Sequence, residues 1–426
     1  MAFGIPQIPG VDCGEFVLFL VENIGYLVAF NVILVAITTK TIRKIAFCLI
    51  PIIIATLVAA VTLGSWEDAR LKGFDVSGPS IREAVEDYVT TGSGNISEIV
   101  ESGKYHPTFG ALEMRYLLQD LLTHTFLHLD AHNQGNIPVA YNKGNDWFKA
   151  TLGDAMVYTS GIFKEGSETN WEAQMNKLDY VAHAVELKKG DKVLDIGCGW
   201  GRLVQHFTDK YGAEMTGVTL SSEQLKYGKE LNGNNGAKLL LQDAMKLHER
   251  TDLVPAKGFD AITCLEMAEH VGIKRYQEFL TKVHKLLKDD GVLYFQVAGL
   301  RRKWQYEDLV WGLFMGEHVF PGADASCPMG WVITQLERAG FEVQRSDNLG
   351  SHYSKTLAHW LEFWQASKDS ISAKYGETSY RRWEAFLAWS VRIARIGSSS
   401  VFMITATKNY QVETRVRSQE HLKKSK

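Results

Sequence analysis

The stretch Lys192–Gly201, Lys-Val-Leu-Asp-Ile-Gly-Cys-Gly-Trp-Gly, constrains the fold of this 426-residue chain more than any other. Its start, Val193–Ile196, is mostly apolar and is typical of a buried parallel strand. Glycines then stand at three alternate positions, where the absence of a Cβ lets the backbone turn sharply and approach a ligand. The next residues, Leu203–Phe207, predict a helix whose first backbone N–H groups point back toward the loop. A strand, a glycine turn and a helix in this order predict a cradle for a nucleotide.

The position of the acidic residue narrows the type of nucleotide. Asp195 precedes the glycines, whereas dinucleotide-binding folds carry their acidic residue about 20 residues further on. This placement resembles motif I of class I methyltransferases, which use S-adenosylmethionine (SAM). A single glycine turn is weak support, so the assignment depends on the residues further along the chain.

From Lys192 onward, strand and helix patterns alternate, which predicts a doubly wound, Rossmann-like α/β sheet. The expected strands are Val193–Ile196, Met215–Thr219, Leu239–Leu241, Asp260–Cys264, Val292–Val297, Glu342–Arg345 and Val401–Ala406. The expected helices between the first five strands are Leu203–Tyr211, Ser222–Leu231 and Tyr276–Leu287.

Two aromatic-rich insertions, Tyr306–Val319 and Tyr353–Ile396, interrupt this alternation. A connection as long as the second one is usually functional inside a compact sheet. We therefore expect a helical lid over an apolar substrate, with an ordinary helical core as the alternative.

Polar residues follow the second and third strands in the order that a bound SAM would need. Thr219 and Gln224 are uncharged side chains that could form hydrogen bonds with ribose hydroxyls. The carboxylate of Asp243 and the neighbouring backbone amides could form hydrogen bonds with the edge of the adenine ring. Tyr158 and Thr159 lie in a loop that could fold over the cofactor. The predicted cofactor-binding residues are Tyr158, Thr159, Asp195, Gly197, Cys198, Gly199, Trp200, Gly201, Thr219, Leu220, Gln224, Gln242, Asp243, Ala244 and Met245.

The first 64 residues contain two apolar segments. Ile45–Leu63 is long enough to cross the hydrocarbon core of a bilayer, which takes about 20 residues. Phe16–Ile37 is also apolar but is interrupted by polar side chains, which makes spanning less secure. We expect a transmembrane helical hairpin in residues 1–64, with buried core helices as the alternative.

The orientation of this hairpin is open, because its short connection carries Lys40, Arg43 and Lys44. The positive-inside rule would place these charges in the cytosol and the rest of the chain in the lumen, away from cellular SAM. Either the second segment is re-entrant or this small charge bias does not set the orientation. We expect a protein bound to the endoplasmic reticulum or Golgi membrane, with its catalytic domain facing the cytosol.

The remaining chain divides into a helical linker or cap at 65–140, a methyltransferase domain at 141–410 and a basic tail at 411–426. A net charge of −3 gives no reason to expect a nucleic-acid partner. The five cysteines lack metal-ligand spacing, so we expect no metal. The oligomeric state is not predicted.

Several motifs together resemble the cyclopropane-fatty-acid synthase superfamily. They are Tyr141–Phe148, Met156–Ser160, Asp195–Gly201 and Glu269–Gly272. Within that superfamily, Cys264–Gly272, Ala298–Leu300, Trp304–Leu313 and Phe320–Ser326 are similar to the sphingolipid C9-methyltransferases of fungi. The resemblance covers roughly residues 141–408. It implies SAM-dependent methylation of C9 in the C8=C9 double bond of a sphingoid base, within ceramide or glucosylceramide, and an N-terminal pair of membrane segments.

The implied reaction needs a well-placed base. An isolated alkene is a weak nucleophile, so the site must align it with the methyl group and exclude water. Methyl transfer leaves a cation on the neighbouring carbon, which aromatic faces and fixed negative charge stabilise. Loss of a proton from the new methyl closes a cyclopropane, whereas loss from C9 restores the double bond. The position of the base therefore decides the product.

The resemblance also implies roles for individual residues. Cyclopropane synthases hold a bicarbonate ion near the methyl; their carboxylate position is Glu269 here and their tyrosine is Tyr353. Their cysteine position is Ser160 and their histidine is Gln296, a departure that weakens the case for an identical bicarbonate clamp. We predict Glu269 as base or ion anchor, Tyr353 as its partner and His270 as an assistant.

Structural alternatives remain open for these residues: Glu269 as the cap of the next helix, Tyr353 as a packing residue and His270 as a structural histidine. Two other functions also remain open. One is a cyclopropane synthase or fatty-acyl methyltransferase acting on phospholipid, and the other is a non-catalytic protein that binds SAM or lipid.

Overall fold

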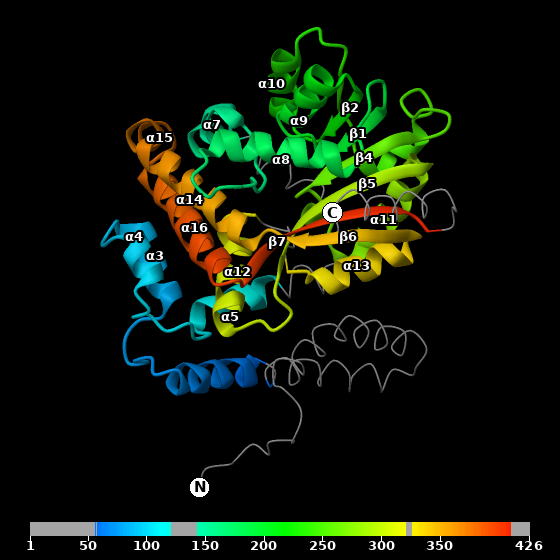
Figure 1. The fold of residues 1–426 in the computed structure, drawn as a ribbon. Helices are drawn as coiled ribbons and strands as arrows, with labels where there is room; N and C mark the ends of the chain where they lie inside the picture. The colour runs from blue at the N-terminus through cyan, green and yellow to red at the C-terminus, as the bar shows by residue number, and fades with distance from the viewer. Residues whose placement is uncertain (1–55, 57, 121–142, 321–325, 410–426) are drawn as a thin grey trace, which may run out of the picture.

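The structure of the protein is a computed structural model, which describes residues 56, 58–120, 143–320 and 326–409 (Figure 1). The predicted hairpin at 1–64 lies almost entirely outside the described residues, and the basic tail at 411–426 lies wholly outside them. Within the described part of the chain, no helix combines the length and the apolar character that crossing a membrane requires.

A seven-stranded mixed sheet forms the centre of the molecule, in the order β3-β2-β1-β4-β5-β7-β6. Its strands are β1 (Lys192–Ile196), β2 (Glu214–Thr219), β3 (Lys238–Leu241), β4 (Phe259–Leu265), β5 (Leu287–Leu300), β6 (Phe341–Asn348) and β7 (Ser399–Lys408). The first five strands run parallel, and β7 is antiparallel to both β5 and β6. All seven predicted strands are present, which confirms the predicted α/β class.

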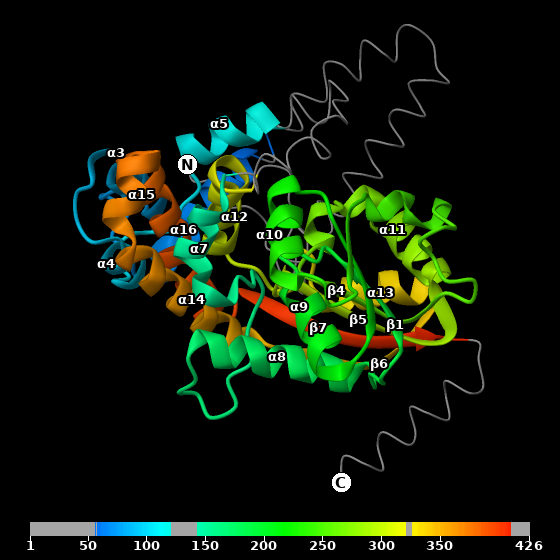
Figure 2. The ribbon, with the colours of Figure 1, turned by 90° about the horizontal axis from the view of Figure 1, so that it is seen from above.

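Helices cover both faces of the sheet, and its central parallel strands β1, β2 and β4 are largely buried, as parallel strands require. On one face, α11 (Ile273–Leu286) and α13 (Met329–Arg338) share a core with β1, β4 and β5. On the other face, α8 (Asn170–Ala184) and α9 (Arg202–His206) pack against β1 and β2. α10 (Ser222–Asn232) lies beside α9 and β3 (Figure 2). The sequence predicted neither α8 nor α13.

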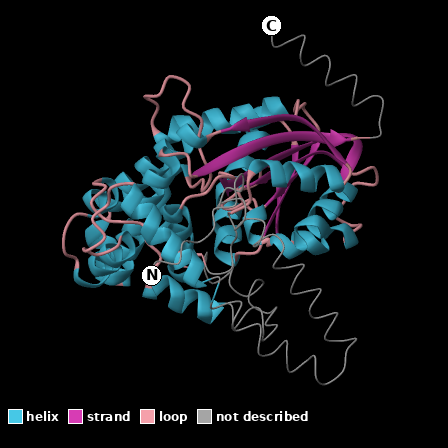
Figure 3. Ribbon diagram, turned by 90° about the horizontal axis from the view of Figure 1, so that it is seen from below, coloured by secondary structure: helices cyan, strands magenta, loops and turns pink. Residues whose placement is uncertain are grey.

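A second, helical layer stands to one side of the sheet (Figure 3). It is built from α3 (Ile81–Thr91), α4 (Ile96–Glu101), α5 (Ala111–Asp120), α7 (Asn145–Leu152), α12 (Tyr306–His318), α14 (Gly350–Ala366), α15 (Lys368–Tyr375) and α16 (Glu377–Arg395). Both predicted insertions are therefore helical, because α12 follows β5 and α14–α16 connect β6 to β7. The helix α3 begins with a reciprocal capping box formed by Ser80 and Glu83.

The aromatic residues of the second insertion form the core of this helical layer. Trp364 and Trp389 are fully buried, and Trp147 from α7 packs 4.7 Å from Trp364 between ring centroids. Trp389 packs 5.5 Å from Phe314 between ring centroids, so burial and ring contacts favour the core interpretation for these rings. The edge of the cluster is different: Tyr158 lies 5.1 Å from Trp360 between ring centroids and also lines a cavity at the edge of the sheet.

Short turns complete the described elements. Short 3₁₀-helices span Gly153–Ala155, Ala244–Glu249 and Ala268–His270, and a π-helical turn, Phe207–Tyr211, extends α9. The turn at Ala268–His270 follows β4 directly and carries two of the predicted catalytic residues.

Candidate active site

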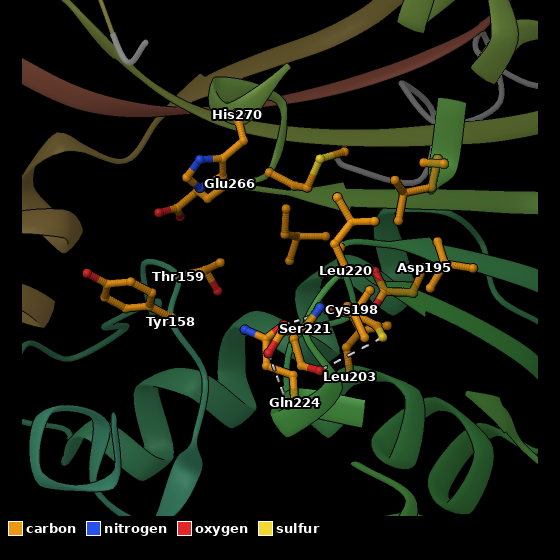
Figure 4. A pocket seen from close by; sticks show the side chains of 18 of the residues that line it. Tyr158, Thr159, Asp195, Cys198, Leu203, Leu220, Ser221, Gln224, Glu266 and His270 are labelled. Atoms are coloured by element: carbon orange, nitrogen blue, oxygen red, sulfur yellow. Dashed lines mark hydrogen bonds between the residues drawn. The ribbon is translucent and has the colours of Figure 1, made fainter. Parts of the chain in front are cut away.

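A cavity of about 190 Å³ opens at the carboxyl ends of β1, β2 and β4 (Figure 4). In a parallel sheet this edge is where ligands bind, because the strands there end in loops and helix starts. Of the predicted cofactor-binding residues, those that line it are Tyr158, Thr159, Asp195, Gly197, Cys198, Gly199, Trp200, Thr219, Leu220, Gln224, Gln242, Asp243, Ala244 and Met245. The structure therefore brings together residues that are spread over 88 positions of the sequence.

Gly201 is the predicted cofactor residue that the cavity lining does not include. Its φ is +79°, and an added Cβ would lie 2.9 Å from Asn232 Nδ2 and 3.3 Å from Gly228 Cα. Gly201 therefore allows α10 to pack against the glycine turn and does not face the cavity. The contact of Gly201 with the cofactor therefore stays a prediction that the cavity lining does not support.

The first two glycines of the turn differ in what surrounds them. Gly197 has φ +78°, and a Cβ there would lie 2.5 Å from Cγ of Met267. Gly199 has φ +52°, and a Cβ there would meet no described protein atom within 4 Å. The space beside Gly199 belongs to the cavity, so a ligand can approach the backbone closely at this point.

Asp195 is a buried carboxylate at the end of β1. It accepts a hydrogen bond from Thr263 Oγ1 at 2.7 Å. Burial raises the pKa of Asp195 to about 6, although this hydrogen bond and the positive charge of Lys177 act in the opposite direction. Asp195 thus presents a charge-bearing acceptor in a cavity with little water to compete.

The polar residues after β2 and β3 are held by local hydrogen bonds. Thr219 Oγ1 donates to Gln224 Oε1 at 2.7 Å, and Ser221 Oγ caps α10 by accepting from Gln224 N. Figure 4 places Ser221 and Gln224 on one side of the cavity, opposite Glu266 and His270. Asp243 Oδ1 accepts from Met245 N at 2.8 Å, so part of this carboxylate stabilises its own turn.

The predicted catalytic residues do not all reach the cavity. His270 lines it, whereas Glu269 and Tyr353 do not. Glu269 is 7% exposed, and its Oε1 accepts a hydrogen bond from Ala298 N at 2.5 Å. The next helix begins after Gly272, so Glu269 does not cap it. Its Oε2 is buried and has no hydrogen-bond partner among the described residues.

Burial sets the charge state of these three residues. Burial and the nearby charge of Glu266 raise the pKa of Glu269 to about 8, so Glu269 is mostly protonated at neutral pH. Burial lowers the pKa of His270 to about 4, which leaves its ring neutral. Burial, with Glu266 and Glu269 nearby, raises the pKa of Tyr353 well above its ordinary value. A protonated Glu269 can donate a proton but cannot accept one.

Four charged residues that the sequence analysis missed line the cavity: Lys177 on α8, Arg202 at the start of α9, Glu266 directly after β4 and Arg275 on α11. Glu266 Oε1 accepts hydrogen bonds from Ser160 N at 2.8 Å and from Gln296 Nε2 at 2.6 Å. Lys177 is fully buried and donates from Nζ to Thr159 Oγ1 at 2.6 Å. Burial lowers the pKa of Lys177 to about 8, although Glu266 and Asp195 oppose this shift.

The signal for Glu266 was present in the sequence, because it follows a predicted strand by two residues at the edge where ligands bind. No comparable signal marked Lys177, because α8 itself was not predicted. Ser160 and Gln296 stand at two of the positions that hold bicarbonate in cyclopropane synthases, where a possible ion pocket was considered. Here both donate hydrogen bonds to the carboxylate of Glu266, and neither residue lines the cavity.

Comparison with known proteins assigns a family to this arrangement. Residues 128–404 match the family described as "Mycolic acid cyclopropane synthetase". The chain is 43% identical over 305 residues to "Sphingolipid C9-methyltransferase 2" of Gibberella zeae, covering 71% of this chain and 58% of that protein. It is 41% identical over 304 residues to "Sphingolipid C9-methyltransferase" of Komagataella phaffii, covering 69% of this chain and 62% of that protein. The chain therefore spans about three fifths of the length of these relatives.

Solved structures show the same fold. The cyclopropane synthase MmaA2 from Mycobacterium tuberculosis is 25% identical with a TM-score of 0.59, covering 65% of this chain and 98% of that one. The mycolic acid cyclopropane synthase CmaA1, solved with SAH and CTAB, is 27% identical with the same TM-score, covering 65% of this chain and 98% of that one. Because the family match covers well over half of the sequence and includes every strand of the sheet up to β7, this chain belongs to the mycolic acid cyclopropane synthetase family.

Proposed function

We propose that this protein is a SAM-dependent methyltransferase that methylates C9 of the C8=C9 double bond of a sphingoid base, within ceramide or glucosylceramide. The main support is the cavity at the carboxyl edge of the sheet, where the glycine turn and polar cofactor residues meet a carboxylate and an aromatic edge. The names of the fungal relatives support the choice of substrate.

The residues of the cavity fit SAM. Gly199 leaves open space beside its backbone, Asp195 supplies a buried acceptor, and Thr219 with Gln224 supplies neutral groups for ribose hydroxyls. SAM, when bound, supplies an electrophilic methyl group. The chain would hold it between the glycine turn of β1 and the loop that carries Tyr158 and Thr159.

The side of the cavity near His270 suits an apolar chain and a transient cation. Tyr158 and His270 lie 6.3 and 6.4 Å from Phe320 between ring centroids, and the Phe320 ring continues this edge into the aromatic core. Aromatic faces attract cations. A neutral His270 adds no positive charge that would oppose the cation, so its lowered pKa favours the reaction.

The assay that tests this function uses purified protein, SAM, and ceramide and glucosylceramide that carry a C8=C9 double bond. We expect a product heavier by one methylene whose fragmentation places a methyl branch at C9. The absence of any methylated sphingolipid, with SAM bound, would contradict the proposal and favour a non-catalytic lipid-binding role.

A second candidate is cyclopropane formation on phospholipid. It is favoured by the 31% identity over 247 residues to "Cyclopropane-fatty-acyl-phospholipid synthase" of Escherichia coli, which covers 58% of this chain and 61% of that protein. Unsaturated phosphatidylethanolamine in the same assay would then yield a ring, which mass spectrometry after ozonolysis separates from a branched alkene.

We also propose that residues 1–64 anchor the protein in the endoplasmic reticulum or Golgi membrane, that 65–140 link this anchor to the methyltransferase domain at 141–410, and that this domain faces the cytosol. The linker is supported by packing: Ser65 is 1% exposed, and its Oγ accepts from Phe109 N at 2.9 Å. Protease treatment of intact microsomes tests the orientation, because a cytosol-facing domain is digested without detergent.

A further inference from the structure

We infer that Glu266, and not Glu269, is the catalytic base that removes the proton after methyl transfer. This inference rests on the proposed function, and it assigns to that site a residue that the sequence analysis did not select. Four observations carry it: the position of Glu266, its backbone conformation, its hydrogen bonds and its charged neighbours.

Position comes first. Glu266 follows β4 directly and lines the cavity, on the same side as His270 (Figure 4). Glu269 is one turn further along and does not line it. A base must lie within hydrogen-bond reach of the proton that it removes, and of these two carboxylates Glu266 is the one that borders the space for substrate.

The backbone of Glu266 is strained. Its φ is +49°, in the left-handed region that residues with a Cβ rarely occupy. The conformation is held by the backbone hydrogen bond from Glu266 N to Gln296 O at 2.7 Å. Glycine would occupy this position without strain, so the glutamate destabilises the folded backbone here. Such strain persists where the side chain has a function. Strain of this kind is concentrated at functional sites.

The hydrogen bonds favour an ionised Glu266 with one free oxygen. Ser160 N and Gln296 Nε2 both donate to Oε1, and no described residue donates to Oε2. Tyr294 OH donates to Gln296 Oε1 at 3.1 Å, which turns the NH₂ group of Gln296 toward Glu266. Two donors on one oxygen stabilise the anion, while Oε2 stays available to accept a proton.

The neighbouring charges favour ionisation of Glu266 over ionisation of Glu269. Burial raises the pKa of Glu266, and the hydrogen bonds from Ser160 and Gln296 and the charge of Lys177 oppose that rise. Glu269 has no cation among the causes of its shift, and its pKa rises to about 8. Two nearby carboxyl groups in a site with little water do not both ionise. The two hydrogen-bond donors and the charge of Lys177 therefore favour the negative charge on Glu266 over Glu269.

The step balances in atoms and charge. The π pair of C8=C9 forms the new bond from C9 to the methyl carbon, while the sulfur–methyl bond breaks and leaves its pair on sulfur. C8 becomes cationic, next to the fixed negative charge of Glu266. The C9–H bond then breaks, its electron pair restores C8=C9, and the proton goes to Glu266 Oε2. Solvent takes that proton after the product leaves.

The substitution Glu266→Gly tests this role, because it removes the carboxylate and relieves the backbone strain together. We expect an unchanged or raised melting temperature, a SAM affinity by calorimetry within about threefold, and a methylation rate lower by about 10²-fold or more. Added formate should restore part of the rate, since a free carboxylate can occupy the vacated position.

Glu186→Gly is the matched control. Glu186 also has a positive φ, +52°, and lies after the end of α8, outside the cavity lining. We expect it to relieve strain in the same way and to leave both methylation and SAM affinity unchanged. Glu269→Gln is the second comparison: it keeps a neutral group at Glu269, so the methylation rate should fall by less than tenfold.

A second measurement separates a base from a structural carboxylate. With substrate deuterated at C9, slower proton removal should make turnover of Glu266→Gly more sensitive to deuterium than turnover of the unaltered enzyme. Full activity in Glu266→Gly, or equal losses of SAM affinity and turnover, would overturn the inference. The proposed function fails separately, if the unaltered enzyme methylates no sphingolipid.

Discussion

Gln296 Nε2 lies 2.6 Å from Glu266 Oε1, which ties the middle of β5 to the residue that follows β4. Gln296 is fully buried and is itself fixed by the hydroxyl of Tyr294. A chain of two hydrogen bonds therefore runs from the interior of the sheet to a carboxylate on the cavity wall. Buried polar networks of this kind hold their members in one geometry when each is satisfied.

Breaking this chain should lower activity more than it lowers stability. Gln296→Leu removes one of the two donors to Glu266 and leaves the Tyr294 hydroxyl buried without its acceptor. We expect a loss of about 1–3 kcal/mol in the free energy of unfolding and a fall in methylation rate of at least about tenfold, measured by urea titration and product mass. Tyr294→Phe is the control, because it keeps the amide of Gln296 that donates to Glu266. A larger loss of methylation rate in Tyr294→Phe than in Gln296→Leu would argue against the network.

Gly199→Asp should abolish SAM binding while the protein stays folded. The position has φ +52°, so a side chain costs about 1 kcal/mol, but no described protein atom lies within 4 Å of the added Cβ. The carboxylate would project into the space that the ligand needs, and it would add a second negative charge near Asp195. Calorimetry measures the affinity, and unchanged binding would defeat the cofactor assignment.

Gly197→Ala should lower stability, in contrast to Gly199→Asp, because the added Cβ at position 197 would meet a protein side chain and not open space. Its Cβ would lie 2.5 Å from Met267 Cγ, in addition to the strain of φ +78°. We expect a loss of about 1–3 kcal/mol in the free energy of unfolding, visible in thermal denaturation without ligand. Stability equal to that of the parent protein would show that Met267 moves aside freely.

The free energy of unfolding should fall as the pH rises from 6.5 toward 8, because Glu269 has a pKa of about 8 in the folded protein and an ordinary value of 4.5. The folded protein binds more protons than the unfolded chain across this range, so each step upward in pH favours unfolding. Asp195, with its pKa of about 6, adds the same trend at lower pH.

The substitution Glu269→Gln removes this group and should flatten the slope above pH 6.5. Denaturant titrations of both proteins across this range supply the measurement. An identical slope in both would mean that Glu269 is already ionised at neutral pH in the folded protein.

Deleting residues 1–55 should release the protein from membranes and leave the methyltransferase domain folded. The cut stops before Ser65 and Ala69, which are almost fully buried, so the packed end of the linker is kept. Membrane fractionation and thermal denaturation measure the two effects. Continued association with membranes would mean that another surface of the protein also binds lipid.

The residue types of single short segments were enough to predict much of the fold. The mostly apolar run before Gly197 predicted a buried strand, and the glycines after it predicted a sharp turn, where the backbone is left-handed in the structure. The cavity-lining residues at the ends of β1, β2 and β3 were predictable for the same reason, since each lies where a strand of the parallel order ends.

Contacts between segments that are distant in the sequence decided which further residues line the cavity. Lys177 and Glu266 are 89 positions apart, and the sequence around neither residue indicates that α8 places the amine in the same cavity as the carboxylate. The same holds for Gln296, whose role depends on its register beside Leu265 across β4 and β5. Spacing predicts which face a side chain takes, because that depends on the local backbone. The burial of a side chain and its charged neighbours depend on packing that only the folded chain creates. That packing therefore also decides which of Glu266 and Glu269 is the more readily ionised.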